Sequence, residues 1–179
     1  MAAGSNVTVA SNGTFDLNNK SQIVNSLTME IGSTGGSQVT LGTDPNATLT
    51  LQGNNVTVNA LGGPSANGGA SITGGTLALN TYTNSGAVTR TFQVADAATG
   101  VDLLISSTIV DGSGTTPFPA SSLTKTGFGD MQFDGSVANT YTGTTTVSDG
   151  SLLLNKTGGG AMSGPLTIGD NALGGGGLA

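Results

Sequence analysis

The carboxylates are the side chains in this sequence with the most chemistry to offer. The 179-residue chain contains no His and no Cys. Nucleophiles activated by imidazole are therefore excluded, as are metal sites built from thiolates or imidazoles. Two carboxylates can hydrolyse a glycosidic bond when roughly 5 to 9.5 Å separates them. The first question is therefore which carboxylates the fold brings within that range.

Two pairs of aspartates are close enough in the sequence to be considered. Asp130 and Asp134 lie on one face of a predicted strand, where about 3.3 Å per residue places them roughly 13 Å apart. That separation is too large for a glycosidase pair. Asp96 and Asp102 flank a predicted turn, so their carboxylates can approach one another. Only the second pair remains a candidate, and turn or surface roles explain it better than catalysis does.

The remaining candidates each have an ordinary structural explanation. Asp111 and Asp149 precede glycines, as aspartates in turns commonly do. The segment Gly169–Asn171 lacks the repeat that is typical of calcium-binding β-helices. Phe118 and Phe128 lie in predicted loops, where packing against the side of the protein is the simpler interpretation than sugar stacking. We therefore predict that the protein is not an enzyme and needs no cofactor or metal.

Charge and hydrophobicity exclude two classes of partner. Charged residues make up 8% of the chain, far below the roughly 25% of an average soluble domain. The basic residues are only Lys20, Arg90, Lys125 and Lys156, and they are scattered. Nucleic-acid binding needs a clustered positive patch, so we predict none. We also predict no membrane span, because no run approaches the roughly 20 apolar residues that one requires.

Short alternating segments dominate the pattern. Pairs such as Val7 with Val9 and Leu49 with Leu51 share one strand face, and Gly, Asn or Pro follows within a few residues. Helical spacing does not persist over any long window. Closely spaced short strands of this kind suit a sandwich, a barrel or a solenoid. Small inward aliphatics and outward Thr, Ser and Asn favour an all-β, right-handed parallel β-helix of roughly eight rungs. An antiparallel β-sandwich is the alternative.

The whole chain is predicted to be one solenoid domain, and we expect it to be a segment of a longer chain. Ala87–Ala95 and Val101–Val110 are predicted as longer, more apolar strands. Ser122–Thr126, Asp130–Asp134 and Thr144–Leu154 are predicted as three strands with glycines at the joints. Within this domain we distinguish four regions by their composition: short-strand rungs at 1–60, longer apolar strands and loops at 61–120, a motif at 121–155 and a Gly-rich end at 156–179.

The motif resembles a known family. Leu123–Leu154 combines LTKTGFG with NTYTG and VSDGSL, in that order, and so resembles the autotransporter-associated β-strand repeat, also called the passenger-associated transport repeat. Asp130–Phe133 departs from it, because the family prefers Thr-Leu-x-Leu there. The residues that carry the resemblance are Leu123, Lys125, Gly127, Gly129, Asn139, Tyr141, Gly143, Val147, Gly150 and Leu152.

The resemblance implies a right-handed β-helix in an exported bacterial protein, at the outer cell surface or outside the cell. A structural role follows as the first expectation, either as a spacer or as a fibre-forming segment. An adhesin that binds glycans or cell surfaces is the alternative, and a carboxylate-based polysaccharide-degrading enzyme comes third. Open rung edges at the two ends also predict end-to-end self-association.

Within the motif, each notable residue has an expected structural task. The glycines permit tight corners. Asn139 is expected to satisfy backbone groups of a turn with its amide, and Tyr141 to lay its ring over a corner with the hydroxyl in solvent. Lys125 is expected to cover apolar surface with its stem or to face Asp130 in an exposed pair, which would contribute little stability.

Overall fold

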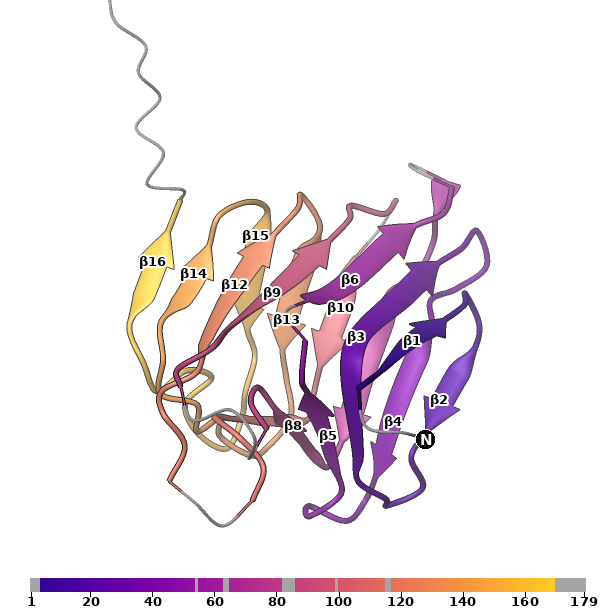
Figure 1. Cartoon of the computed structure of the whole chain (residues 1–179). Helices are drawn as coiled ribbons and strands as arrows, with labels where there is room; N and C mark the ends of the chain where they lie inside the picture. The colour runs from indigo at the N-terminus through magenta and orange to yellow at the C-terminus, as the bar shows by residue number, and fades with distance from the viewer. Residues whose placement is uncertain are drawn as a thin grey trace, which may run out of the picture.

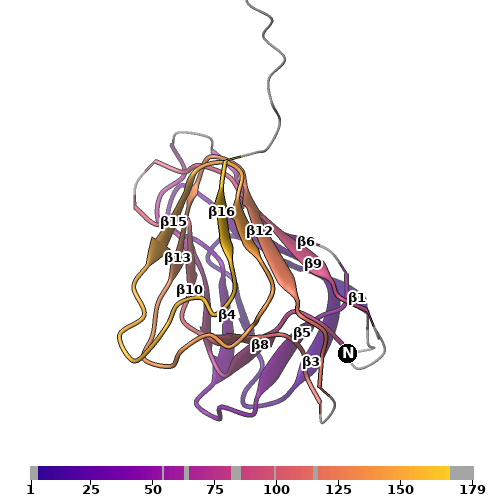
Figure 2. The same ribbon diagram turned by 90° about the vertical axis from the view of Figure 1, so that its left-hand side faces the viewer.

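The computed structural model describes residues 4–53, 55–62, 65–81, 86–98, 100–114 and 117–169. The chain coils through short strands that run side by side from one end of the molecule to the other (Figure 1). We call one full turn of this coil a rung. The strands form three faces around a narrow interior, as the two side views show (Figures 1 and 2).

Each face is a stack of strands from successive rungs. The first face consists of β1 (Ser5–Val9), β3 (Gln22–Ile31), β6 (Asn55–Ala60), β9 (Thr89–Val94), β12 (Ser122–Thr126), β14 (Thr145–Val147) and β16 (Leu166–Ile168). The second face consists of β2 (Thr14–Asp16), β4 (Gln38–Gly42), β7 (Ala70–Gly74), β10 (Leu103–Ile105), β13 (Asp130–Phe133) and β15 (Ser151–Leu154). The third face consists of the start of β3 with β5 (Thr48–Leu51), β8 (Thr76–Ala78) and β11 (Thr108–Val110).

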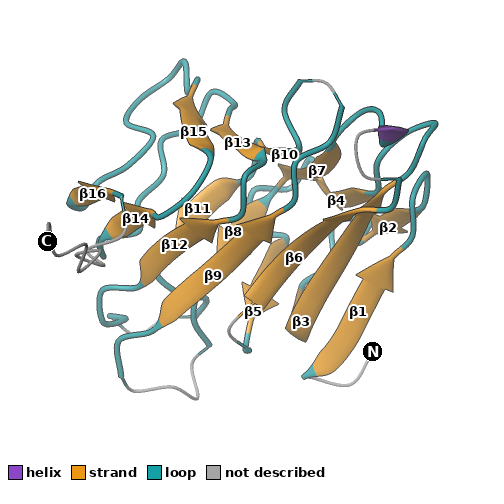
Figure 3. Ribbon diagram, turned by 90° about the horizontal axis from the view of Figure 1, so that it is seen from above, coloured by secondary structure: helices purple, strands orange, loops and turns teal. Residues whose placement is uncertain are grey.

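Parallel pairing between rungs defines the fold. In the part of the chain that the structure describes, every ladder between named strands is parallel. β3 pairs with β5 through Gln22–Val24 and with β6 through Leu27–Ile31, so it runs from the third face onto the first. Seen from above, the strands of the first face lie side by side across the molecule (Figure 3), whereas Figure 2 looks along the stack from the end that carries β16. The predicted parallel β-helix is confirmed, and parallel ladders rule out the antiparallel sandwich.

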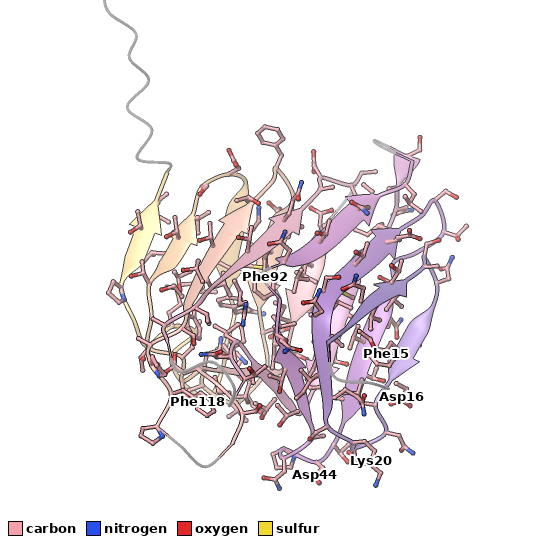
Figure 4. The ribbon with its side chains drawn as sticks, viewed as in Figure 1. Phe15, Asp16, Lys20, Asp44, Phe92 and Phe118 are labelled. Atoms are coloured by element: carbon pink, nitrogen blue, oxygen red, sulfur yellow. The ribbon has the colours of Figure 1, made fainter. Side chains whose placement is uncertain are left out.

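The core is built from columns of inward side chains that continue from rung to rung. Alternation along each strand sends every second residue inward, and parallel register stacks these residues directly. Phe92, for example, lies inside the body behind β9 (Figure 4). The column of the first face contains Val7, Leu27, Val56, Phe92, Lys125, Val147 and Ile168. The column of the second face contains Phe15, Val39, Ile72, Ile105, Phe133 and Leu154.

Rung length differs between the middle of the molecule and its C-terminal part. In the middle, Val56 pairs with Leu27 in the rung before it and with Phe92 in the rung after it. In the C-terminal part, Thr145 pairs with Leu123 and with Leu166, and the chain between these partners is much shorter. Among the described residues the first face has seven strands, one fewer than the eight rungs expected from the sequence. The reason is that the rungs between Leu27 and Phe92 contain more residues than an even division into eight rungs allows.

Two predicted strands are wrong in their extent. Val101–Val110 divides into β10 and β11, and Thr144–Leu154 divides into β14 and β15. The physical reason is the three-faced cross-section, because a strand that exceeds one face must turn a corner. The first of these corners, at Ser106–Ser107, has neither Gly nor Pro to mark it. Among the described residues, none lies in a helix of the length and apolarity that crossing a membrane requires.

Candidate functional site

The repeat segment, residues 123–154, begins on the first face and continues over the next two. Leu123 and Val147 point inward and are buried, as the alternation predicts. Leu152 pairs with the buried Met131 and is half-buried. These three side chains belong to the core of the solenoid. The remaining motif residues gather at the corner between the first and second faces and on the third face.

Lys125 occupies a place where the neighbouring rungs have apolar side chains. It is fully buried, and in the parallel register it lies between Phe92 and Val147. The expectation of an exposed Lys125 is therefore wrong. The sequence did contain the signal, because Leu123 and Lys125 are two residues apart on one strand and must share its inward face.

Backbone carbonyls surround the Lys125 ammonium. Nζ donates hydrogen bonds to the carbonyl oxygens of Thr126 at 3.2 Å, of Asp149 at 2.9 Å and of Gly127. Burial lowers the pKa of Lys125, and the nearby negative charge of Asp130 and other carboxylates opposes this shift. Asp130 thus acts on Lys125 through its charge, while hydrogen bonds to carbonyls hold the ammonium.

Two motif glycines are required by the space around them, Gly150 at the corner beside Lys125 and Gly143 just before β14. Gly150 has φ of +65°, a region that favours glycine, and a Cβ there would lie 2.7 Å from the Lys125 Nζ. A Cβ at Gly143 would lie 2.4 Å from the backbone of Ser121 on the adjacent rung. The predicted role of the glycines in tight corners is confirmed, and Gly127 and Gly129 lie at the turn between β12 and β13.

Asp102 is a structural residue of the same corner; the sequence predicted it at a turn, but did not predict its burial or its bond to the next rung. It is almost fully buried, and its carboxylate accepts hydrogen bonds from the N–H groups of Asp130 (2.7 Å) and Ala97 (2.9 Å). Burial raises the pKa of Asp102; the two backbone hydrogen bonds lower it, and the charge of Asp96 adds to the rise. Since both Asp102 oxygens bind backbone N–H groups, the carboxylate serves to close the turn.

Asn139 links three successive rungs through its side chain. Its Oδ1 accepts a hydrogen bond from the N–H of Ile109 in β11 at 2.9 Å, and its Nδ2 donates to the carbonyl of Ala161 at 2.8 Å. Ile109 lies in the preceding rung and Ala161 in the following one. The prediction that the Asn139 amide satisfies backbone groups is confirmed. The structure adds that it does so where the third face has no strand among the described residues of these rungs.

Tyr141 lies inside the rung and not over its surface. The side chain is fully buried, and its hydroxyl forms a 2.6 Å hydrogen bond with Thr145 Oγ1. Burial raises the pKa of Tyr141 to about 12. The expectation of a hydroxyl in solvent is wrong. Thr145 and Leu123 share an inward position on adjacent rungs, so the phenol meets a polar partner inside the core.

The other candidates from the sequence take surface or turn positions. Asp111 accepts a hydrogen bond from the N–H of Ser121 at 2.7 Å, as an aspartate in a turn does. Phe118 packs over Gly112, since a Cβ there would lie 2.5 Å from the ring. Phe128 is 78% exposed. The proposed cation turn at 169–171 falls mostly outside the described residues.

Three of the four basic side chains donate to backbone carbonyls. Besides Lys125, Arg90 Nε donates to the carbonyl of Leu79, and Lys156 Nζ donates to that of Ser107 at 3.1 Å. Burial lowers the pKa of Arg90 and of Lys156. These cations are therefore used to satisfy the backbone, and a basic surface patch does not form from them.

Neither of two shallow surface grooves brings chemistry together. The larger, of about 390 Å³, runs over Gly42, Gly74 and Gly135, and its other lining residues are also uncharged. The smaller, of about 380 Å³, lies on the third face beside β5 and also has only uncharged lining residues. Across the ranges that the structure describes, no three acidic side chains cluster as ligands for a metal ion.

Comparisons with known proteins identify the repeat segment. A search of curated proteins and a search of solved structures gave no match. A family model described as the passenger-associated-transport-repeat matches residues 123–154, the same stretch on which the resemblance rests. The chain therefore contains a segment similar to this repeat, which is typical of autotransporter passenger domains and indicates an exported, surface-exposed protein.

Proposed function

We propose that this chain serves as a rigid spacer within an exported bacterial surface protein. The observation that carries the proposal is the continuous parallel ladder from β1 to β16 along the first face. Each rung adds about 4.8 Å to the length of such a stack. A stack whose rungs are hydrogen-bonded to one another resists bending far better than a flexible linker does, so it can hold another domain away from the surface.

The use of the motif residues supports a structural role. Lys125, Asn139 and Tyr141 are all buried, and each has its polar atoms bonded within the solenoid. Asp102, the carboxylate with a raised pKa, is bonded to backbone N–H groups. Catalytic groups must reach a substrate, and these groups face the interior. We therefore propose that the protein is not catalytic and acts without a cofactor.

Surface display tests the spacer role directly. The chain would be inserted between a cell-surface anchor and a small reporter domain. The matched control is a Gly/Ser linker of about nine residues, whose fully extended length equals the roughly 30 Å of the solenoid. We expect an antibody of large size to bind the reporter at least several-fold better above the solenoid, because a flexible linker leaves it close to the surface. Equal antibody binding with both inserts would contradict the spacer role.

One observation favours adhesion as the second candidate. Phe128 projects from the corner between β12 and β13 and is 78% exposed, and exposed aromatic rings can stack on sugars or on a partner protein. Glycan-array binding of the purified chain and of Phe128→Ala tests this candidate. Retention that depends on Phe128 would support adhesion, and no retention on any glycan or cell surface would remove it.

A further inference from the structure

The turn between β4 and β5 contains the only Asp-Pro peptide bond of the chain, between Asp44 and Pro45. A bond of this kind is hydrolysed in acid more readily than other peptide bonds. The proline nitrogen has no N–H and carries an additional carbon substituent, so it takes up a proton more readily as it leaves. Both residues are exposed, and Pro45 lines the larger surface groove. Water and acid therefore reach this bond in the folded protein.

The turn directs the Asp44 carboxylate along its own peptide bond. Oδ1 accepts hydrogen bonds from the backbone N–H of Asn46 at 2.9 Å and from its Nδ2 at 3.1 Å. The ring that the first of these bonds closes contains the carbonyl carbon of Asp44 and the nitrogen of Pro45. Oδ2 accepts no hydrogen bond from the described residues, so it remains available as a nucleophile.

The carbonyl of Asp44 is polarised, and the backbone on either side of it is held. The N–H of Ala47 donates to this carbonyl oxygen at 3.1 Å, where negative charge develops when a nucleophile attacks the carbon. The N–H of Asp44 donates to Asn19 Oδ1 at 2.8 Å. Thr76 Oγ1 donates to the carbonyl of Pro45 at 2.8 Å. The rungs before and after thus hold the turn in this geometry.

We propose that the bond between Asp44 and Pro45 is a self-cleavage site that acid activates. Asp44 Oδ2 attacks the backbone carbonyl carbon of the same residue, and a cyclic anhydride forms as the bond to the Pro45 nitrogen breaks. That nitrogen takes a proton from the solvent and leaves as a secondary amine. One water molecule then opens the anhydride and restores the side-chain carboxyl group. The products are fragment 1–44, which ends in a free carboxyl group, and fragment 45–179, which begins with proline.

Acid acts on two groups of this reaction in opposite ways. Protonation of the Pro45 nitrogen needs acid, whereas the attack needs an ionised Asp44. At this corner the charged side chains of the preceding rung are Asp16 and Lys20 (Figure 4), and the following rung has none at 74–76. Mild acid, in which an ionised carboxylate and a proton donor coexist, therefore favours cleavage, and the bond stays intact at neutral pH.

The two fragments remain joined after the cut, because strands of one pair with strands of the other. The shorter fragment contains β3 and β4, and parallel ladders connect them to β5, β6 and β7 of the longer fragment. Leu27, Met29 and Val39 of the shorter fragment are fully buried in the shared core. Cleavage therefore opens one corner of the solenoid and leaves the stack of rungs in place.

Incubation of the purified chain in acid tests the site. The chain is held at about pH 4, where free aspartates are partly ionised, and mass spectrometry identifies fragments 1–44 and 45–179. The same incubation in concentrated guanidinium measures the cleavage of this bond outside the fold. Because the folded turn positions the carboxylate, we expect cleavage at least about tenfold faster in the folded chain than in denaturant. Light scattering before denaturation should show an unchanged mass.

Two variants remove the reacting groups one at a time. Asp44→Asn removes the nucleophile but keeps an oxygen acceptor for the turn, and Pro45→Ala restores an N–H to the leaving nitrogen. Each should cleave at least about tenfold more slowly than the parent. The matched control is Asp16→Asn, which should cleave at the parental rate. Asp16 Oδ1 accepts a hydrogen bond from the N–H of Asn18 at 2.8 Å in the same kind of turn, but Leu17 follows it.

Four results would overturn the inference. They are equal rates in the folded and denatured chains, a folded parent without fragments, cleavage after Asp16 as fast as after Asp44, and a parent that circular dichroism shows to be unfolded at this pH. Fragments that separate before denaturation would overturn the intact stack. The spacer role is decided separately by the display experiment at neutral pH, so its failure and the failure of self-cleavage are distinguishable.

Discussion

The third face is built in two different ways along the molecule. In the N-terminal rungs it consists of strands, β5, β8 and β11, which pair with one another and with the start of β3. In the rungs that contain the repeat segment, the chain at 136–143 crosses this face without a strand. There the side chain of Asn139 bonds to the rungs on either side, in addition to a few backbone hydrogen bonds such as that from Thr140 N–H to the carbonyl of Ile109.

The side chains in the interior also differ between these two parts of the molecule. The column of the first face is apolar through Val7, Leu27, Val56 and Phe92, and then receives Lys125. Rung length falls over the same boundary. A shorter rung must turn its corners more tightly, and tight corners leave carbonyl and N–H groups pointing inward without a ladder partner. The buried Lys125 satisfies carbonyl groups of this kind, which is why it interrupts the apolar column where the short rungs begin, before Val147 and Ile168 continue it.

The largest effect is expected when a lysine is placed in the aliphatic part of the column. Val56→Lys puts an ammonium at a fully buried position, where the strand continues to Ala60 and no glycine corner follows two residues later. An unpaired buried charge costs several kcal/mol or forces the lysine to lose its proton. We expect the variant to lose more than about 4 kcal/mol of unfolding free energy and to be largely unfolded by circular dichroism.

The control for that variant is Thr57→Lys, on the adjacent outward position of the same strand. It should stay within about 0.5 kcal/mol of the parent, as surface substitutions usually do. If Val56→Lys instead folds with near-parental stability, burial of Lys125 needs no special corner, and the distinction between the two parts of the column is wrong.

The next effect is expected at Asn139. Asn139→Ala leaves the buried N–H of Ile109 and the carbonyl of Ala161 without their partners. An unsatisfied buried group costs about 1 to 3 kcal/mol, so we expect a loss of roughly 2 to 6 kcal/mol in urea unfolding. Asn139→Asp keeps the acceptor and loses the donor, and it should fall between Asn139→Ala and the parent.

Asn155→Ala is the matched control for Asn139, because Asn155 is exposed and its amide makes only a long 3.3 Å hydrogen bond to Asp134. Its expected loss is below about 0.5 kcal/mol. Similar losses at Asn139 and Asn155 would show that the third face of the short rungs does not depend on the side-chain bridge.

The sequence predicts this fold well, because each strand of a parallel stack shows alternating inward apolar and outward polar residues. Val7 with Val9 and Leu49 with Leu51 are two residues apart and face the interior as expected. The corners are harder to predict. Ser106–Ser107 turns a corner inside an apolar run, and nothing in the local residue types distinguishes it from a continuing strand.

The roles of the motif residues are harder to predict than the fold, because they depend on contacts between rungs. Lys125 follows Leu123 by two residues, so its inward position could have been read from the pattern, although a lysine is expected outside. Tyr141 lies in a segment without strand periodicity, and its burial depends on Thr145, the next inward residue of the same rung. Asp102 depends on the N–H of Asp130 in the next rung, a contact that only the rung length can reveal.

A smaller loss is expected for Lys125→Met. The substitution keeps most of the side-chain volume and removes the hydrogen bonds to Gly127 and Asp149, but it also removes the desolvation penalty of a buried charge. We expect a net loss of about 1 to 3 kcal/mol at pH 7. Lys20→Met at an exposed position should have almost no effect.

The dependence of the unfolding free energy on alkaline pH tests whether the Lys125 ammonium is buried. The pKa of Lys125 is lowered in the folded state, so at alkaline pH the unfolded chain holds this proton more firmly than the folded chain does. The contribution of Lys125 to stability therefore rises as the pH increases from its folded pKa toward the ordinary value of about 10.4. The unfolding free energy of the parent minus that of Lys125→Met should grow over this window, and a constant difference would contradict the burial of the ammonium.

The smallest effect at pH 7 is expected for Tyr141→Phe, which removes only the hydrogen bond between the phenol and Thr145. A loss of about 0.5 to 1.5 kcal/mol follows. The dependence of the unfolding free energy on alkaline pH distinguishes a buried phenol from an exposed one more clearly. Because burial raises the pKa of Tyr141 to about 12, the unfolded phenol loses its proton first, near pH 10. The contribution of Tyr141 to stability is therefore complete below about pH 10 and declines as the pH rises to about 12.

Absorbance titration of the phenolate measures that pKa directly. The chain has two tyrosines, so Tyr82→Phe leaves Tyr141 as the sole signal. In the folded protein its midpoint should lie near 12, and in concentrated denaturant near about 10. A folded midpoint close to the denatured one would place the hydroxyl in solvent and return Tyr141 to the outside of the rung. A midpoint near 12 would place the pair of Tyr141 and Thr145 inside the short rungs, where the fold also buries the ammonium of Lys125.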